Sequence, residues 1–234
     1  MVRSAEVRSV ISEVNKIKTA LNLFEDKYDY LPGDLPNAYD YFDGSGGSAI
    51  CGNSAQNVGS CNGNGNRQID GGFTTRDEHL SLWVHLNLSD MLPNNMTGQL
   101  TSAPQRYVPG INMYPSKLDS AGFELQWGSG IGGGNDLYDK DTGNSIRFGR
   151  TTGGTSLKAP VLTPAEAKQI DKKMDDGIAS SGKLMGARGT ETTYFPQGKC
   201  TTTSQFYGFN DTYGSNDYLV SNSERSCYLV FWLE

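Results

Sequence analysis

The sequence predicts an α+β fold in which a long N-terminal amphipathic helix packs on an antiparallel β-sheet, with long Gly/Asn-rich loops and short extra helices. Three observations lead to this class: apolar residues at helical spacing near the N-terminus, short strand-like segments further along, and 29 glycines in 234 residues. Glycine above its usual share of about 7% favours strands, turns and ordered loops. We expect residues 1–34, a helix and turn, to form a single domain with a globular head, residues 35–234.

The first expected element is a helix that ends near Tyr30. Its apolar residues recur in steps of three and four and draw one stripe, while the other face is charged. The stripe consists of Val10, Val14, Ile17, Leu21 and Phe24. Proline lacks an amide hydrogen and disfavours helical geometry in the residue before it, so Pro32 should end the helix. Pro32, Gly33 and Asp34 are expected to turn the chain away, with Asp34 accepting hydrogen bonds from following amides, as Asx turns do.

Two further helices carry start signals. Thr75 to Glu78 forms one capping box, and Thr163 to Glu166 forms another with proline at the first helical position. The second of these helices should end at Gly177.

Four segments have the composition of strands: 122–127, 144–150, 204–210 and 227–234. The last is continuously apolar, which predicts a central, buried strand. The Gly/Asn-rich stretches 43–72 and 128–156 are interrupted by Cys, Trp, Tyr and Ile, and we interpret them as ordered surface loops.

Charge and motifs argue against several classes of function. The net charge is −6 and the basic residues are scattered, so the sequence gives no electrostatic footprint for nucleic acid. The glycines of 128–133 fit G-x-G-x-x-G, but turn residues follow where a dinucleotide site needs a helix. His79 and His85 lie about 240° apart around a helix, so we interpret them as ordinary surface or capping residues rather than a metal pair. The sequence gives little support for a hydrolase with a Ser or Cys nucleophile. A glycosidase that uses two carboxylates remains an alternative.

Four cysteines, Cys51, Cys61, Cys200 and Cys227, allow three pairings and contain no C-x-x-C motif. They indicate an oxidising compartment, the alternative being four reduced thiols in a cytosolic protein. No tetrahedral zinc spacing is present. The sequence has neither a transmembrane stretch nor a signal peptide, so we expect that an export segment precedes these residues.

The chain resembles the soluble domain of type IV pilins and of the pseudopilins of type II secretion. Residues 4–30 resemble the amphipathic second half of the family's N-terminal helix. The segment "YDYLPGDLPNA" resembles the helix-to-loop transition in one group of pilin-like proteins. Two further stretches resemble other parts of the same group: "GNGNRQI" followed by "EHLSLWVHL", and "LTPAEAKQIDKKMDDGIASSG". The span from Cys200 to Cys227 resembles the disulfide-bounded C-terminal region of many pilins. The apolar half-helix of the family is absent here.

The resemblance implies a non-enzymatic structural subunit of a type IV pilus or secretion filament. Its partners would be other pilin-like subunits. The missing half-helix would first anchor the protein in the inner membrane with a periplasmic head, and the protein would later join an extracellular filament. The stripe would pack on the sheet or on a neighbouring subunit. Disulfides 51–61 and 200–227, the pairings with the shortest loops, are expected. No cofactor is expected, although calcium binding near the C-terminal disulfide occurs in some pseudopilins.

Calcium candidates are Asp211 and Asp217, and a second acidic loop contains Asp139 and Asp141. That loop has Arg150 where an EF-hand would place its bidentate glutamate, so hydrogen-bonded turns fit better. Asp175 and Asp176 end a helix against its dipole and hint at an inter-subunit partner.

Two alternatives to a structural subunit remain. One is a minor-pilin or lectin-like module that binds a host or glycan surface through aromatic side chains, namely Trp127, Tyr138, Tyr207 and Tyr213. The other is a secreted hydrolase.

Overall fold

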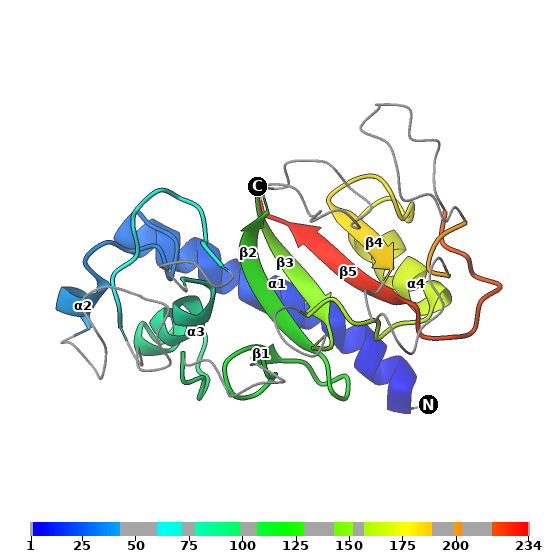
Figure 1. Cartoon of the computed structure of the whole chain (residues 1–234), viewed down its shortest axis with the longest axis horizontal. Helices are drawn as coiled ribbons and strands as arrows, with labels where there is room; N and C mark the ends of the chain where they lie inside the picture. The colour runs from blue at the N-terminus through cyan, green and yellow to red at the C-terminus, as the bar shows by residue number, and fades with distance from the viewer. Residues whose placement is uncertain are drawn as a thin grey trace.

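The computed structural model describes residues 2–42, 60–71, 78–98, 107–128, 143–151, 157–188, 199–202 and 217–233. Its elements follow the order α1 (Val2–Tyr28), α2 (Ala38–Tyr41), α3 (Glu78–Leu88), β1 (Tyr114–Pro115), β2 (Gly122–Gly128), β3 (Gly143–Gly149), α4 (Pro164–Met174), β4 (Leu184–Arg188) and β5 (Cys227–Trp232). The strands form one antiparallel sheet in the order β1-β2-β3-β5-β4 (Figure 1). The predicted α+β class, with its long N-terminal helix, is confirmed.

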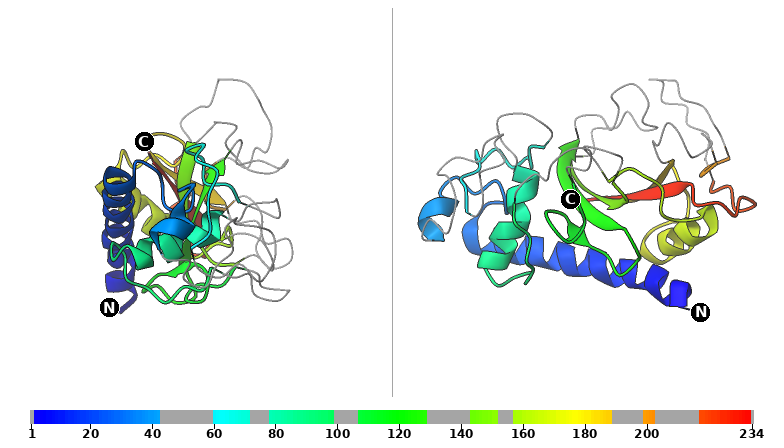
Figure 2. Two further views of the ribbon diagram at one scale, coloured as in Figure 1. Left: turned by 90° about the vertical axis from the view of Figure 1, so that its left-hand side faces the viewer. Right: turned by 60° about the horizontal axis from the view of Figure 1, so that its bottom comes forward.

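Helix α1 runs along one side of the molecule, with α2 and α3 gathered near its C-terminal end (Figure 2). The five residues of the predicted stripe are all buried, none more than 3% exposed. They share one hydrophobic cluster with alternate residues of β2, β3 and β5: Phe123, Leu125, Ile146, Phe148, Leu229 and Phe231. Each such side chain contributes about 1.5–3 kcal/mol when fully buried, so this contact is a major part of the core.

Strand β5 lies between β3 and β4, inside the sheet, as its apolar sequence predicted. Its alternate residues Tyr228 and Val230 form a separate buried cluster with Met185 and Ala187 of β4. The sequence did not predict β1 or β4. Gly186 explains part of the failure to predict β4. A Cβ at this position would lie 2.2 Å from the Tyr218 ring, so the strand requires a glycine, a residue that is rare in strands and gives no strand signal in the sequence. The predicted strand 204–210 lies outside the described residues.

Helix α4 begins with the predicted capping box. The Thr163 side chain accepts from the Glu166 amide, and the Glu166 side chain accepts from the Thr163 amide. The helix ends at Met174, three residues before the predicted Gly177, which instead adopts a positive φ of 79° in the following turn. Helix α3 begins at Glu78, and the rest of its predicted capping box lies outside the described residues.

Within the described segments, no helix combines the length and the apolar character that crossing a membrane would require.

Candidate functional site

The turn after α1 packs directly against the start of α3. Gly33 has a φ of 89°, and a Cβ on it would lie 2.5 Å from the Glu78 carbonyl oxygen. A side chain at this position would therefore meet both backbone strain and a backbone clash. The glycine of the Pro-Gly turn is what lets α3 approach the end of α1.

Asp34 is fully buried and binds a segment distant in sequence. Its carboxylate accepts hydrogen bonds from the amides of Gly65, Asn66 and Arg67, at 2.6, 3.1 and 2.7 Å. The prediction of an Asx-type turn to the next residues is thus wrong, because the partner amides lie 31 to 33 positions away. Burial raises the pKa of Asp34, while these three amides oppose the rise. We call residues 60–71, which carry the amides, the strap.

Glu78 binds the same strap from the first turn of α3. Its two carboxylate oxygens accept from the amides of Asn64 and Asp70, both at 2.9 Å. Burial raises the pKa of Glu78 to about 7, and the negative charges of Asp34 and Asp70 add to the rise. Two buried carboxylates together satisfy five amides of the strap.

The prediction that His79 and His85 are surface or capping residues is wrong, because both are fully buried. The His85 Nδ1 atom accepts from the Gly33 amide at 2.9 Å, and its Nε2 lies 3.0 Å from the Cys61 carbonyl oxygen. An amide can only donate, so Nδ1 has no proton and Nε2 carries it. Burial lowers the pKa of His85 to about 4, and the ring stays neutral. The His79 ring packs edge-on against Tyr107.

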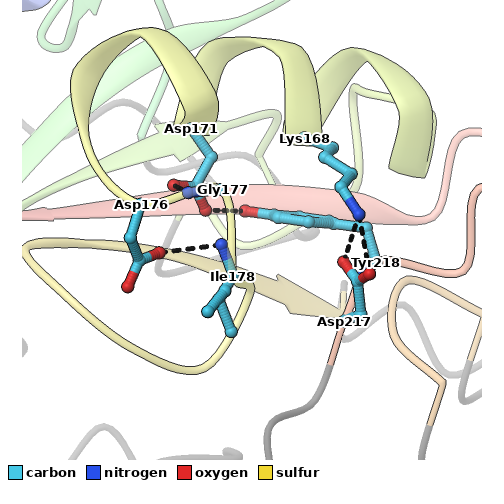
Figure 3. A network of polar contacts seen from close by, with 7 residues as sticks. All are labelled: Lys168, Asp171, Asp176, Gly177, Ile178, Asp217 and Tyr218. Atoms are coloured by element: carbon cyan, nitrogen blue, oxygen red, sulfur yellow. Dashed lines mark hydrogen bonds and ion pairs between the residues drawn. The ribbon is translucent and has the colours of Figure 1, made fainter.

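A second polar network joins α4 to the C-terminal segment (Figure 3). The Tyr218 hydroxyl donates to Asp171 at 2.7 Å, and the Gly177 amide donates to the same carboxylate at 2.8 Å. Burial raises the pKa of Asp171 to about 6, with the charges of Asp176 and Asp175 adding to the effect. Nothing in the sequence linked Asp171 to a tyrosine 47 positions later.

Asp171, Asp175 and Asp176 place carboxylate oxygens within 4.8 Å of one another, the donor type that calcium prefers. Each carboxylate is already used by the turn that follows the helix. Asp175 accepts from the amides of Lys183 and Leu184, and Asp176 accepts from the Ile178 amide and the Ser181 hydroxyl. The paired acids that hinted at an inter-subunit partner therefore have an internal role, which is to fix the turn.

The Asp217 carboxylate, a predicted calcium candidate, faces a cation of its own chain. The Lys168 ammonium donates to both of its oxygens at 2.6 Å and lowers the pKa of Asp217 (Figure 3). A calcium ion would have to displace this lysine. Asp211, Asp139 and Asp141 lie outside the described residues, while Arg150 donates to the Pro160 carbonyl oxygen.

The disulfide Cys200–Cys227 is present, as predicted, with 5.1 Å between the Cα atoms. It ties the segment that bears Tyr218 to the first residue of β5, because Thr201 pairs with Tyr218 beside it. Cys61 is also disulfide-bonded, but Cys51 lies outside the described residues, so the pairing 51–61 stays a prediction.

The aromatic and glycine-rich candidates are only partly described. Trp127 is half-buried in β2, whereas Tyr138, Tyr207 and Tyr213 lie outside the described residues. Gly128 is the last residue of β2, and the rest of the G-x-G-x-x-G stretch is likewise outside them.

Sequence reasoning missed a buried ion pair in the sheet. Arg147 and Glu124 lie opposite each other on β3 and β2, with 3.8 Å between Nη1 and Oε1, and the Leu157 amide donates to Glu124. The alternation of charged and apolar residues in the two strands was the signal that could have found it.

The outward face of α1 is polar over its middle and carries both charged and uncharged side chains. Its exposed residues include Ser12, Asn15, Lys16, Thr19, Asn22 and Leu23. The flanking charges Arg3 and Glu25 bind this chain itself, through Glu166 and Arg67. The helix thus buries one face in its own core and presents a polar, partly charged surface on the other.

No family model matches the chain, and the comparisons with curated proteins and with solved structures gave no match either.

Proposed function

We propose that the protein is a non-enzymatic structural subunit of a pilin-like filament and that the described fold is its globular head. The observation that supports this proposal is helix α1. It spans 27 residues, buries an apolar stripe on the sheet and leaves its opposite face to solvent. Such a helix suits a subunit that must hold its own head and also contact other copies along the same axis.

The chemistry of the described polar groups agrees with a structural role. His79 and His85 are fully buried, and His85 is fixed between two backbone groups. Asp171 and its neighbouring aspartates are committed to the turn after α4. These groups organise segments of the chain, as a structural role requires.

The proposed partners are further copies of the chain or related subunits. In the proposed assembly, an apolar half-helix preceding residue 2 anchors the subunit in the inner membrane and later packs in the filament core. The disulfide Cys200–Cys227 would keep the C-terminal segment fixed on the outside of the head.

The decisive experiment places charge on the outward face of α1 in the full-length protein in its native host. Ser12→Arg and Thr19→Arg replace exposed residues, so each purified head should unfold at the wild-type temperature. We expect these variants to lose the sheared extracellular filaments that antibodies against the head detect in wild type. Asp40→Arg, an exposed position on α2, is the matched control and should keep them.

Two outcomes would overturn the proposal. One is that the wild-type protein is found only as a free monomer and never in a filament fraction. The other is that the charged α1 variants assemble as well as the control.

A further inference from the structure

We propose that the outward face of α1 binds a second copy of this chain in parallel orientation, shifted along the helix axis so that Arg8 of one copy pairs with Asp26 of the next. The contact rests on the proposed filament function and adds to it the residues and the register through which the copies meet.

Most charged side chains of α1 are already used within the chain. Several bind groups on other segments, namely Arg3, Glu13, Lys18 and Glu25. The Lys16 Nζ atom lies 3.5 Å from the Tyr114 hydroxyl oxygen, and the Lys27 ammonium lies over the Tyr28 ring. These charges therefore help to hold α1 on its own head.

Arg8 and Asp26 are different. Both side chains are exposed, and within the described segments neither takes part in an ion pair or a side-chain hydrogen bond. A guanidinium and a carboxylate can form a bidentate, charge-assisted pair. Each copy therefore offers one unpaired cation and one unpaired anion on the same helix.

The spacing of the two residues points them in the same direction. They are 18 positions apart on α1, which is about five full turns and about 27 Å along the axis. The exposed residues between them on this side are short and polar: Ser12, Asn15, Thr19 and Asn22. Short side chains at a contact let two helices approach closely. Leu23, which is 50% exposed beside them, would be covered by the same contact.

A shift of about 27 Å between parallel copies brings Arg8 of one copy opposite Asp26 of the next. Every copy then uses Arg8 toward one neighbour and Asp26 toward the other, so the contact is heterologous and repeats without closing. An antiparallel arrangement would also join the two residues, but it would use both charges in one closed pair. Only the parallel arrangement continues as a filament.

The ion pair would set the register of the contact more than its strength. Exposed ion pairs contribute little to stability, whereas like charges brought face to face are strongly disfavoured. The affinity would come from the apolar half-helix of the proposed assembly. Reversal of one charge should therefore disturb assembly more than its removal does.

The first test reverses each charge in the full-length protein in its native host and measures the sheared extracellular filaments. We expect Arg8→Glu and Asp26→Arg each to lower the filament yield by about tenfold or more, because like charges then face each other. The double variant restores opposite charges and should regain most of the wild-type yield. Arg225→Glu and Asp40→Arg, at exposed positions outside α1, are the matched controls and should assemble as wild type.

Cysteine cross-linking tests the orientation without charge reversal. A chain with both Arg8→Cys and Asp26→Cys, treated on intact cells with a short bismaleimide reagent, should yield a ladder of covalent multimers. Each single cysteine variant should yield none, because equal positions in neighbouring copies lie about 27 Å apart along the axis. A product that stops at covalent dimers would show an antiparallel contact and overturn the proposal.

Failure of the contact is distinguishable from failure of the proposed function. The register is wrong, and the filament function stands, if wild type forms filaments while the two charge reversals assemble as well as their controls. The same holds if the double variant stays as defective as the single ones. If wild type never enters a filament fraction, the proposed function is wrong and the contact falls with it.

Discussion

Replacing Asp34 by Asn should destabilise the head by about 3 kcal/mol. Asparagine keeps one oxygen, which can hold the bonds to Gly65 and Asn66 without the help of a negative charge. Its NH₂ group would then face the Arg67 amide, so a 2.7 Å hydrogen bond is replaced by two donors in conflict. One lost bond to a charged acceptor costs about 1.5–3 kcal/mol, and a buried unsatisfied donor costs about 1–3. Removal of the desolvated charge returns part of this loss.

The assay is urea unfolding together with thermal melting at pH 7. For a chain of this size, about 3 kcal/mol corresponds to a fall of about 6–12 °C in the unfolding temperature. The matched control is Asp40→Asn, an exposed aspartate six residues later, which should stay within about 0.5 kcal/mol of wild type. A loss below about 1 kcal/mol for Asp34→Asn would refute the reasoning, as would an equal loss in the control.

Four further predictions are tested by the same unfolding assays, by hydrogen exchange and by NMR titration. Replacing Cys200 and Cys227 by Ser opens a loop of 27 residues and should lower the free energy of unfolding by about 3.5 kcal/mol. Hydrogen exchange should become faster mainly in residues 217–226, and unchanged exchange there would contradict this prediction. Tyr218→Phe removes the donor to Asp171 and should cost about 1–2 kcal/mol while raising the pKa of Asp171 further. The raised pKa of Asp171 makes a contribution to stability that is present at low pH and should be lost as pH rises from the ordinary pKa of 3.8 through about 6. An NMR titration with a pKa at the ordinary value would remove this contribution, and one below it would reverse its sign. Gly33→Ala should cost about 3 kcal/mol or more, because its Cβ meets a backbone carbonyl of α3, and a near-neutral result would contradict the geometry.

Features decided by local chemistry could be predicted from the sequence. The stripe on α1 follows from helical spacing over a few turns, and the capping box at Thr163 is a contact over three residues. The central place of β5 follows from its unbroken apolar run, since such a strand must be covered on both faces. The disulfide at its first residue joined the two cysteines that lie close in the sequence.

The polar groups of the candidate site could not be predicted in the same way. The sequence suggested a surface or capping role for His85 and a capping-box role for Glu78, yet both side chains are fully buried. Tyr218 contacts Asp171 from a distant segment, which its pairing with Thr201 and the Lys168–Asp217 ion pair also hold beside α4. A polar side chain in a sequence does not reveal which backbone groups will surround it, and its pKa depends on those groups.

The sequence by itself determined the helix, its end at the Pro-Gly turn and the apolar strand, because each depends on the residues within a turn or two of the chain. Only the tertiary structure decided that Asp34 binds amides 31 to 33 residues away and that His85 stays neutral beneath the strap. The physical reason is that a desolvated charge or donor is stabilised only by the particular groups packed around it, and folding brings these groups together from distant parts of the chain.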